Sequence, residues 1–138
     1  MKRIFFALFI MLTMSINASA QAKMQVDKLT HDFGTFSREA GVQVCTFIIT
    51  NVGDKPLVIN QAMASCGCTV PKFTKEPIKP GEKGELKIEY NGTSNFPGKF
   101  KKSITVRTNG SPQMTRLYVQ GAEFSESLNF SFYNITFI

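Results

Sequence analysis

The chain has 138 residues, a length that fits one domain with a modest hydrophobic core. Its 16 basic and 10 acidic residues give a net charge of +6. The basic residues are spread through the sequence, and no motif indicates a nucleic-acid-binding module, so this function class is excluded.

Residues 1–20 have the three parts of a signal peptide in the usual order. A basic start, Met1-Lys2-Arg3, precedes an apolar run over residues 4–14, and Ala18-Ser19-Ala20 forms a small-residue cleavage site. We therefore expect a mature chain that begins at Gln21, with 14 basic and 10 acidic residues and a net charge of +4. An uncleaved anchor helix is the alternative, and the order of the three parts disfavours it.

The predicted export determines in which compartment we expect the protein. The residue directly after the cleavage site is Gln21 and not a cysteine, which disfavours a lipoprotein anchor, and no later apolar stretch reaches the length of a transmembrane helix. We expect a protein of the periplasm, the cell envelope or the extracellular medium, with no transmembrane span after cleavage.

The mature sequence alternates between strand-like runs and turn residues, with no helical period. Residues 24–29 are predicted as the first strand and residues 30–34 (THDFG) as a bend. Residues 42–51 (VQVCTFIITN) give the strongest strand signal, because β-branched and aromatic residues dominate them. Period-two alternation places Cys45, Phe47 and Ile49 on one face of this strand.

Later strands follow the same pattern. The predicted strands cover residues 57–63 and 85–91, and two more contain residues 100–106 and 117–121. Residues 64–71 are predicted as a connecting loop. The side chains expected in the core are Leu86, Ile88, Tyr90, Phe100, Ile104, Val106, Leu117 and Val119. These strands predict an all-β fold, an immunoglobulin-like antiparallel β-sandwich of about seven strands, without the Trp or the intersheet cysteine pair of antibody domains.

The predicted domain covers residues 21–123, and a Phe-rich tail covers residues 124–138. Leu128, Phe130 and Phe132 alternate with polar residues in this tail, as in an amphipathic strand. An extra edge strand on the sandwich is the preferred interpretation. A partner-binding strand and a frayed coding end are the alternatives.

The three cysteines are Cys45, Cys66 and Cys68, so a monomer in an oxidising compartment retains at least one free thiol. If residues 42–51 and 57–63 form a hairpin, Cys45 lies opposite Ala62. Cys66 is then about 13 Å farther along the strand, beyond the ~7 Å that a disulfide spans between Cα atoms. This geometry favours a Cys66–Cys68 disulfide and a buried Cys45, unless the strand bends or the two strands belong to different sheets.

Several motifs occur in a fixed order along the mature chain. They are HDFG (31–34), F-x-I-x-N-x-G-D-K-P-L-x-I (47–59), SCGCTVP (65–71), KEPIKPGEKG (75–84), GKFKKSITVRTN (98–109) and L-x-V-x-G (117–121). Together they resemble the domain-of-unknown-function 1573 family over about residues 25–122. The resemblance implies an immunoglobulin-like fold and export from a bacterial cell, and the family has no assigned activity. Cys45 and the Phe-rich tail depart from its pattern.

The Cys66-Gly67-Cys68 motif is the one segment that could carry chemistry. A disulfide across one residue closes a small ring, and a ring that departs from relaxed geometry would exchange readily with other thiols. Against a redox role, the motif lacks the C-x-x-C spacing at a helix N-terminus that lowers the pKa of an attacking thiol. Soft-metal binding is a weaker candidate: Cys66, Cys68 and Met63 could hold Cu(I), and a zinc site would need Cys45 and His31 to converge on the motif.

A structural disulfide that pins the loop is the preferred interpretation of the motif. The His31-Asp32 pair could act as an acid or base, but no motif places a nucleophile beside it. The sequence therefore predicts a non-catalytic binding or scaffolding module of the bacterial envelope, without a cofactor. It does not identify the partner, for which another envelope protein is the candidate. Thiol–disulfide redox or soft-metal chemistry at Cys66 and Cys68 is the alternative function.

Overall fold

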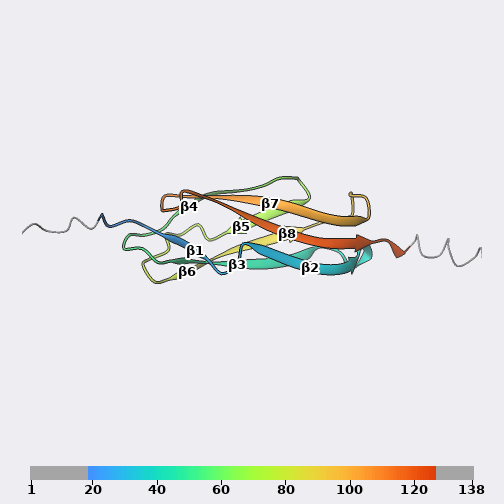
Figure 1. Cartoon of the computed structure of the whole chain (residues 1–138), viewed down its shortest axis with the longest axis horizontal. Helices are drawn as coiled ribbons and strands as arrows, with labels where there is room; N and C mark the ends of the chain where they lie inside the picture. The colour runs from blue at the N-terminus through green and yellow to red at the C-terminus, as the bar shows by residue number, and fades with distance from the viewer. Residues whose placement is uncertain (1–18, 127–138) are drawn as a thin grey trace, which may run out of the picture.

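The alternating apolar residues build two β-sheets that pack face to face (Figure 1). The structure, a computed structural model, describes residues 19–126. A short 3-10 helix (Arg38–Ala40) follows the second strand. The strands are β1 (Met24–Val26), β2 (Thr30–Ser37), β3 (Gln43–Asn51), β4 (Ile59–Ala64), β5 (Thr69–Phe73), β6 (Lys83–Tyr90), β7 (Gly98–Thr108) and β8 (Met114–Phe124).

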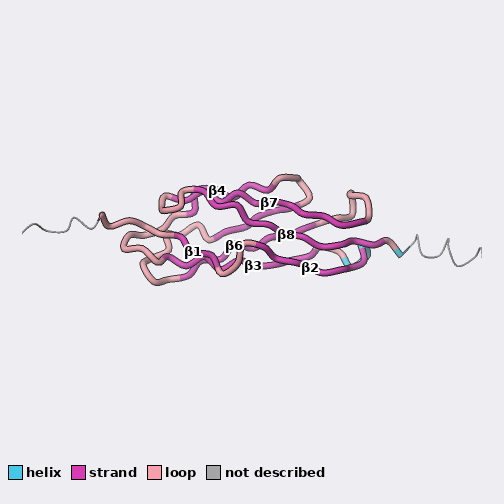
Figure 2. The backbone as a smooth tube through the Cα atoms, viewed as in Figure 1, coloured by secondary structure: helices cyan, strands magenta, loops and turns pink. Residues whose placement is uncertain are grey.

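The strand order confirms the predicted immunoglobulin-like β-sandwich. One sheet, called sheet 1 below, has the order β1-β3-β6-β5, and the other, sheet 2, has the order β2-β8-β7-β4. Figure 2 shows that strands make up most of the described chain and run along its long axis. All pairings are antiparallel except β2 with β8, which run parallel. The fold has eight strands rather than about seven.

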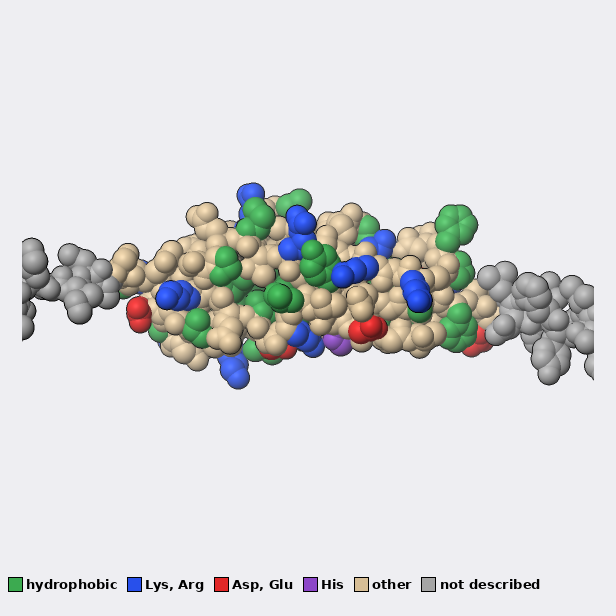
Figure 3. All heavy atoms as spheres, in the orientation of Figure 1, with side chains coloured by type: hydrophobic (Ala, Val, Ile, Leu, Met, Phe, Trp, Pro, Cys, Tyr) green, Lys and Arg blue, Asp and Glu red, His purple; other side chains and the backbone are tan. Residues whose placement is uncertain are grey.

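The core lies between the sheets and is formed by residues that the alternation predicts, except that Phe100 is only half-buried. Cys45 pairs with Ile88 and Phe47 with Leu86 across β3 and β6. On the other sheet, Ile104 pairs with Leu117 across β7 and β8. The fully buried apolar and aromatic side chains are Phe47, Ile49, Leu57, Leu86, Ile88, Tyr90, Ile104, Val106, Leu117 and Val119. The residues between them cover the outer faces, where Figure 3 shows many Lys and Arg side chains on the face that it presents.

The predicted bend at residues 30–34 is wrong, because these residues belong to β2. Gly34 has a φ of 71° and lies inside a register shift between Asp32 and Thr35. Only glycine adopts this backbone conformation without strain, so the turn-like composition marks a bulge within a strand and not the end of one. The first predicted strand is correspondingly shorter and ends at Val26.

The predicted hairpin between residues 42–51 and 57–63 is also wrong. β3 lies in sheet 1 and β4 in sheet 2, so Cys45 is not opposite Ala62, which pairs with Val106. The segment predicted as a loop over residues 64–71 also ends in a strand, β5, which pairs with β6. β5 contains Pro71, which a sheet tolerates here because β5 is an edge strand.

The strands run along the long axis, so the loops gather at two ends (Figure 1). We call one end the disulfide end; it carries residues 38–42, 65–68 and 91–97 and the end of β8. The opposite end carries the loops 52–58 and 109–113. The predicted signal peptide up to residue 18 and the tail from residue 127 lie outside the described residues. Among residues 19–126, no helix is long and apolar enough to cross a membrane.

Candidate functional site

The Cys66-Gly67-Cys68 turn lies at the disulfide end and is held on two sides. A disulfide joins Cys66 to Cys68, whose Cα atoms are 5.3 Å apart. The Asn91 amide donates to the Cys68 carbonyl at 2.8 Å, which ties the turn to the end of β6. On the other side, the Ser65 amide donates to the Ser103 carbonyl at 2.9 Å, which ties it to β7. The turn therefore connects the two sheets.

The structure does not bring the other predicted metal-binding residues to this turn. Cys45 is buried in the core on β3, where burial raises the pKa of its thiol to about 11. Met63 is 56% exposed on the outer face of β4, and His31 lies on β2. Among the described residues, no group of three or more His, Cys, Asp and Glu side chains is close enough to hold a metal ion.

His31 and Asp32 are adjacent in sequence but have separate roles. Partial burial and then the nearby Lys28 lower the pKa of His31, whose Nδ1 lies 3.3 Å from the Lys28 ammonium. Asp32 accepts hydrogen bonds from Gln120 Nε2 at 2.9 Å and from the Gly34 amide at 2.7 Å, and these bonds lower its pKa. Asp32 thus fixes the bulge of β2 against β8, and the two residues do not form an acid–base pair.

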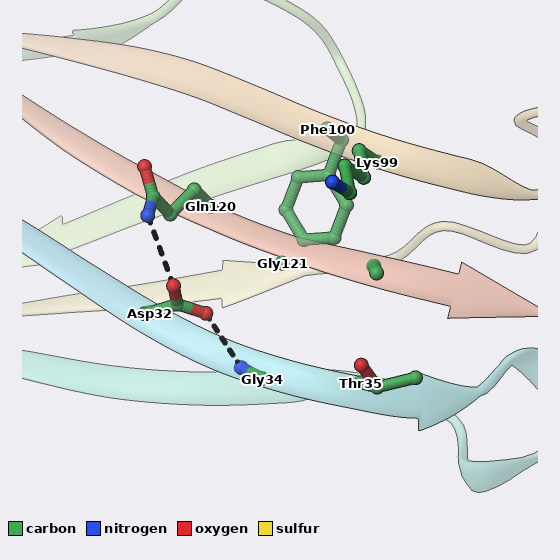
Figure 4. Close-up of a pocket in the computed structure, with 8 residues that line it drawn as sticks. Asp32, Gly34, Thr35, Lys99, Phe100, Gln120 and Gly121 are labelled. Carbon is green, nitrogen blue, oxygen red and sulfur yellow. Dashed lines mark hydrogen bonds between the residues drawn. The ribbon is translucent and has the colours of Figure 1, made fainter.

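An open hollow lies beside this bulge (Figure 4). It has a volume of about 380 Å³, and Asp32, Lys99 and Gln120 stand around it. Gly121 leaves the ring of Phe100 accessible, since a Cβ at this position would come within 3.1 Å of that ring. The bulge in β2 and the glycine in β8 together shape this surface.

A buried polar and aromatic layer supports the loops of the disulfide end. The Tyr90 hydroxyl donates to Glu123 Oε2 at 3.1 Å and accepts from Asn95 Nδ2 at 3.2 Å. The Tyr90 ring stacks on Phe100 at 4.1 Å between centroids, and burial raises the pKa of its hydroxyl. A Cβ at position 92 would come within 1.5 Å of Glu123 Oε1, so only glycine fits there.

Glu123 is a site residue that was not predicted, although the strand pattern carries a signal for it. Leu117 and Val119 point into the core, and continuing the alternation through Gly121 places Glu123 on the same face. A carboxylate at a core position needs a hydrogen-bonding partner, and Tyr90 supplies it.

The loop 91–97 is fixed at its base and exposed at its tip. The Asn95 amide donates to the Gly92 carbonyl at 2.8 Å, and the Thr93 hydroxyl donates to Asn91 Oδ1 at 2.8 Å. The Arg38 guanidinium also donates to the Thr93 carbonyl. Beyond these contacts Phe96 is 97% exposed, the most exposed of the large apolar side chains among the described residues. A large ring held in water on an anchored loop can contact an apolar partner at little ordering cost.

Comparison with known proteins identifies the family. The family model described as protein of unknown function (DUF1573) matches residues 24–122. The chain belongs to the DUF1573 family. This confirms the resemblance drawn from the ordered motifs. No curated protein matches this DUF1573 chain.

Solved structures share the fold of this DUF1573 protein at low sequence identity. A protein of unknown function from Porphyromonas gingivalis W83 is 18% identical with a TM-score of 0.67; the match covers 78% of this chain and 50% of that one. The ASH/PapD-like domain 7 of human CEP192 is 8% identical with a TM-score of 0.62, over 76% and 87% of the two chains. The periplasmic chaperone SfaE is 9% identical with a TM-score of 0.56, and the match covers 75% of this chain and 60% of the chaperone chain. The chain thus spans half the length of the Porphyromonas protein, and these similarities establish the fold alone.

Proposed function

We propose that this DUF1573 protein is an exported, non-catalytic binding or scaffolding module of the bacterial envelope, and that it holds a protein partner at the disulfide end. The observation that carries the proposal is Phe96, which is 97% exposed at the tip of a hydrogen-bonded loop. The signal-peptide pattern of residues 1–20 supports export.

The loops are favoured over the sheet edges as the binding site. An exposed edge strand can pair with a strand of another chain, and proteins prevent this with bulges, prolines or very short edges. β5 contains Pro71, β1 has three residues, and both β2 and β4 have a register shift. All four edge strands are thus poor templates for an added strand.

Thiol–disulfide exchange has one observation in its favour. Cys66 and Cys68 are half-buried and line a hollow of about 330 Å³ together with Asn91, Ser94 and Asn95, so a small thiol could approach. The residues lining this hollow supply amides and a hydroxyl, but no cation or helix N-terminus that would stabilise a thiolate. The disulfide is therefore better explained as a clamp on the turn.

The proposed function can be tested with paired variants. The chain from Gln21 is immobilised and exposed to an envelope fraction of the bacterium that encodes it. We expect the wild type and a Val52→Ser control, altered at the opposite end, to retain the same partner, and Phe96→Ser to lose it. Equal retention by all three proteins would contradict the proposal. A partner released only by reductant would instead support the exchange reaction.

A further inference from the structure

The outer face of sheet 2 carries a row of cations along its two central strands. Inward residues of β7 and β8 are buried, and the residues between them point outward. Lys99, Lys101 and Arg107 lie outward on β7, and Arg116 lies outward on β8 opposite Thr105. From Lys99 to Arg107 the cations on β7 are eight residue steps apart, or about 27 Å at the usual rise of a strand. Figure 3 has the same orientation as Figure 1, in which β7 and β8 are labelled. It shows Lys and Arg side chains spread along this face of the molecule.

These cations lack acidic partners. The two ion pairs within residues 19–126, Lys72–Glu89 at 2.9 Å and Lys87–Glu89 at 3.4 Å, both lie on sheet 1. Asp32 is the acid on the outer face of sheet 2, and its carboxylate already accepts from Gln120 and Gly34. The face thus has four cations against one engaged carboxylate, an excess of three positive charges.

Apolar and amphipathic side chains lie among the cations. The Lys101 ammonium lies 4.7 Å from the centre of the Tyr118 ring. Met63 and Met114 are 56% and 49% exposed, and both line a shallow hollow with Arg107. Flexible thioethers and an amphipathic phenol suit a boundary between water and an apolar phase.

We propose that this basic face of sheet 2 docks the domain on an anionic membrane surface, a role beyond the proposed protein binding at the disulfide end. Charge complementarity is the argument: unpaired cations spread over a sheet face match a planar array of anionic headgroups better than they match one compact anion. The methionines and Tyr118 favour lipid over a soluble polyanion, which offers no apolar phase. Because the disulfide end lies at the tip of the long axis, a docked domain leaves it accessible (Figure 1).

Vesicle sedimentation tests this proposal without any protein partner. The chain from Gln21, which contains every strand and core residue, is mixed with phosphatidylcholine vesicles with or without about one third phosphatidylglycerol. Since each cation near an anionic surface contributes about a five-fold gain in affinity, we expect the wild type to bind the anionic vesicles at least 100-fold more tightly than the neutral ones. The binding should weaken in high salt.

Two variants with the same net charge locate the effect. Neutralising sheet 2 with Lys99→Gln, Lys101→Gln, Arg107→Gln and Arg116→Gln should lower the partition at least 100-fold, whereas Lys72→Gln, Lys79→Gln, Lys83→Gln and Lys87→Gln should lower it less than 10-fold. Equal losses in the two variants, or no preference of the wild type for anionic vesicles, would overturn the proposal. Binding to soluble dextran sulfate without binding to vesicles would also overturn it and assign the face to an anionic polymer.

Discussion

The two ends of the sandwich are closed by different means. At the opposite end a buried amide, Asn51, donates to the carbonyls of Lys55 and Ile78 and accepts from the amides of Gly53 and Lys23. The disulfide end uses a covalent bond and the Tyr90–Glu123 pair, and it leaves Phe96 in water. The opposite end thus holds its loops through the hydrogen bonds of one buried amide, whereas the disulfide end holds its loops covalently and through a buried pair while one apolar side chain stays in water.

The largest expected effect comes from Asn51→Ala. Removing the side chain leaves buried carbonyl and amide groups without partners, so the free energy of unfolding should fall by about 3–5 kcal/mol. At the disulfide end, Glu123→Gln keeps an acceptor for Tyr90 and should cost about 1 kcal/mol or less. Urea unfolding of the two variants measures the difference, and similar losses would contradict the contrast between the ends.

The predictable part of the fold was its centre. β3, β6 and the middle of β7 alternate so regularly that the core positions follow from parity alone. The wrong predictions concern edge strands, where the local composition and the tertiary pairing disagree. Gly34 and Pro71 indicate turns by composition, yet both lie within strands that pair on one side only. The crossover of β4 to the other sheet depends on packing between distant residues, which periodicity does not encode.

The site was predictable only in part. The cysteine turn could be singled out from its spacing, but its neighbourhood could not, because Asn91 and Ser103 come from a loop and a strand far along the chain. Phe96 gave no signal in the sequence, since phenylalanine is among the residues most often buried and nothing in the local composition marks this one as exposed.

Alkaline pH should destabilise the core between the two ends. The pKa of the Cys45 thiol rises from 9.0 to about 11 on folding because burial disfavours the thiolate. The neutral thiol is the form that the folded chain prefers, so its stabilisation is complete below pH 9 and is lost as the pH rises to about 11. The loss should be about 2–3 kcal/mol, and Cys45→Ala should flatten this part of the pH profile. Since Tyr90 titrates nearby, Tyr90→Phe is the control, and a slope that survives in Cys45→Ala would contradict the assignment.

The disulfide should have a smaller and local effect. Replacing both cysteines with Cys66→Ser and Cys68→Ser opens a ring of a few residues, so the loss should be about 1–2 kcal/mol. Amide exchange should become faster at Thr69 and Asn91 and stay unchanged at Asn51. The unfolded wild type should show one thiol without reductant and three with it, and three thiols without reductant would show that the bond is not formed.

Phe96→Ser should have the smallest effect on stability, within about 0.5 kcal/mol, because the ring is in water in the folded chain. Thermal unfolding measures this, with Val52→Ser as the exposed control at the opposite end. A clear loss of stability would show that Phe96 packs against the protein and is not held ready for a partner.

Photocrosslinking in the living cell tests most directly whether the disulfide end is the binding surface. A benzophenone amino acid is placed in turn at Phe96, at Val42 on the same end, and at Val52 on the opposite end, where all three native side chains are at least half exposed. We predict one adduct of the same mass from positions 96 and 42 and none from position 52. Adducts from position 52 alone, or from all three positions equally, would contradict the account.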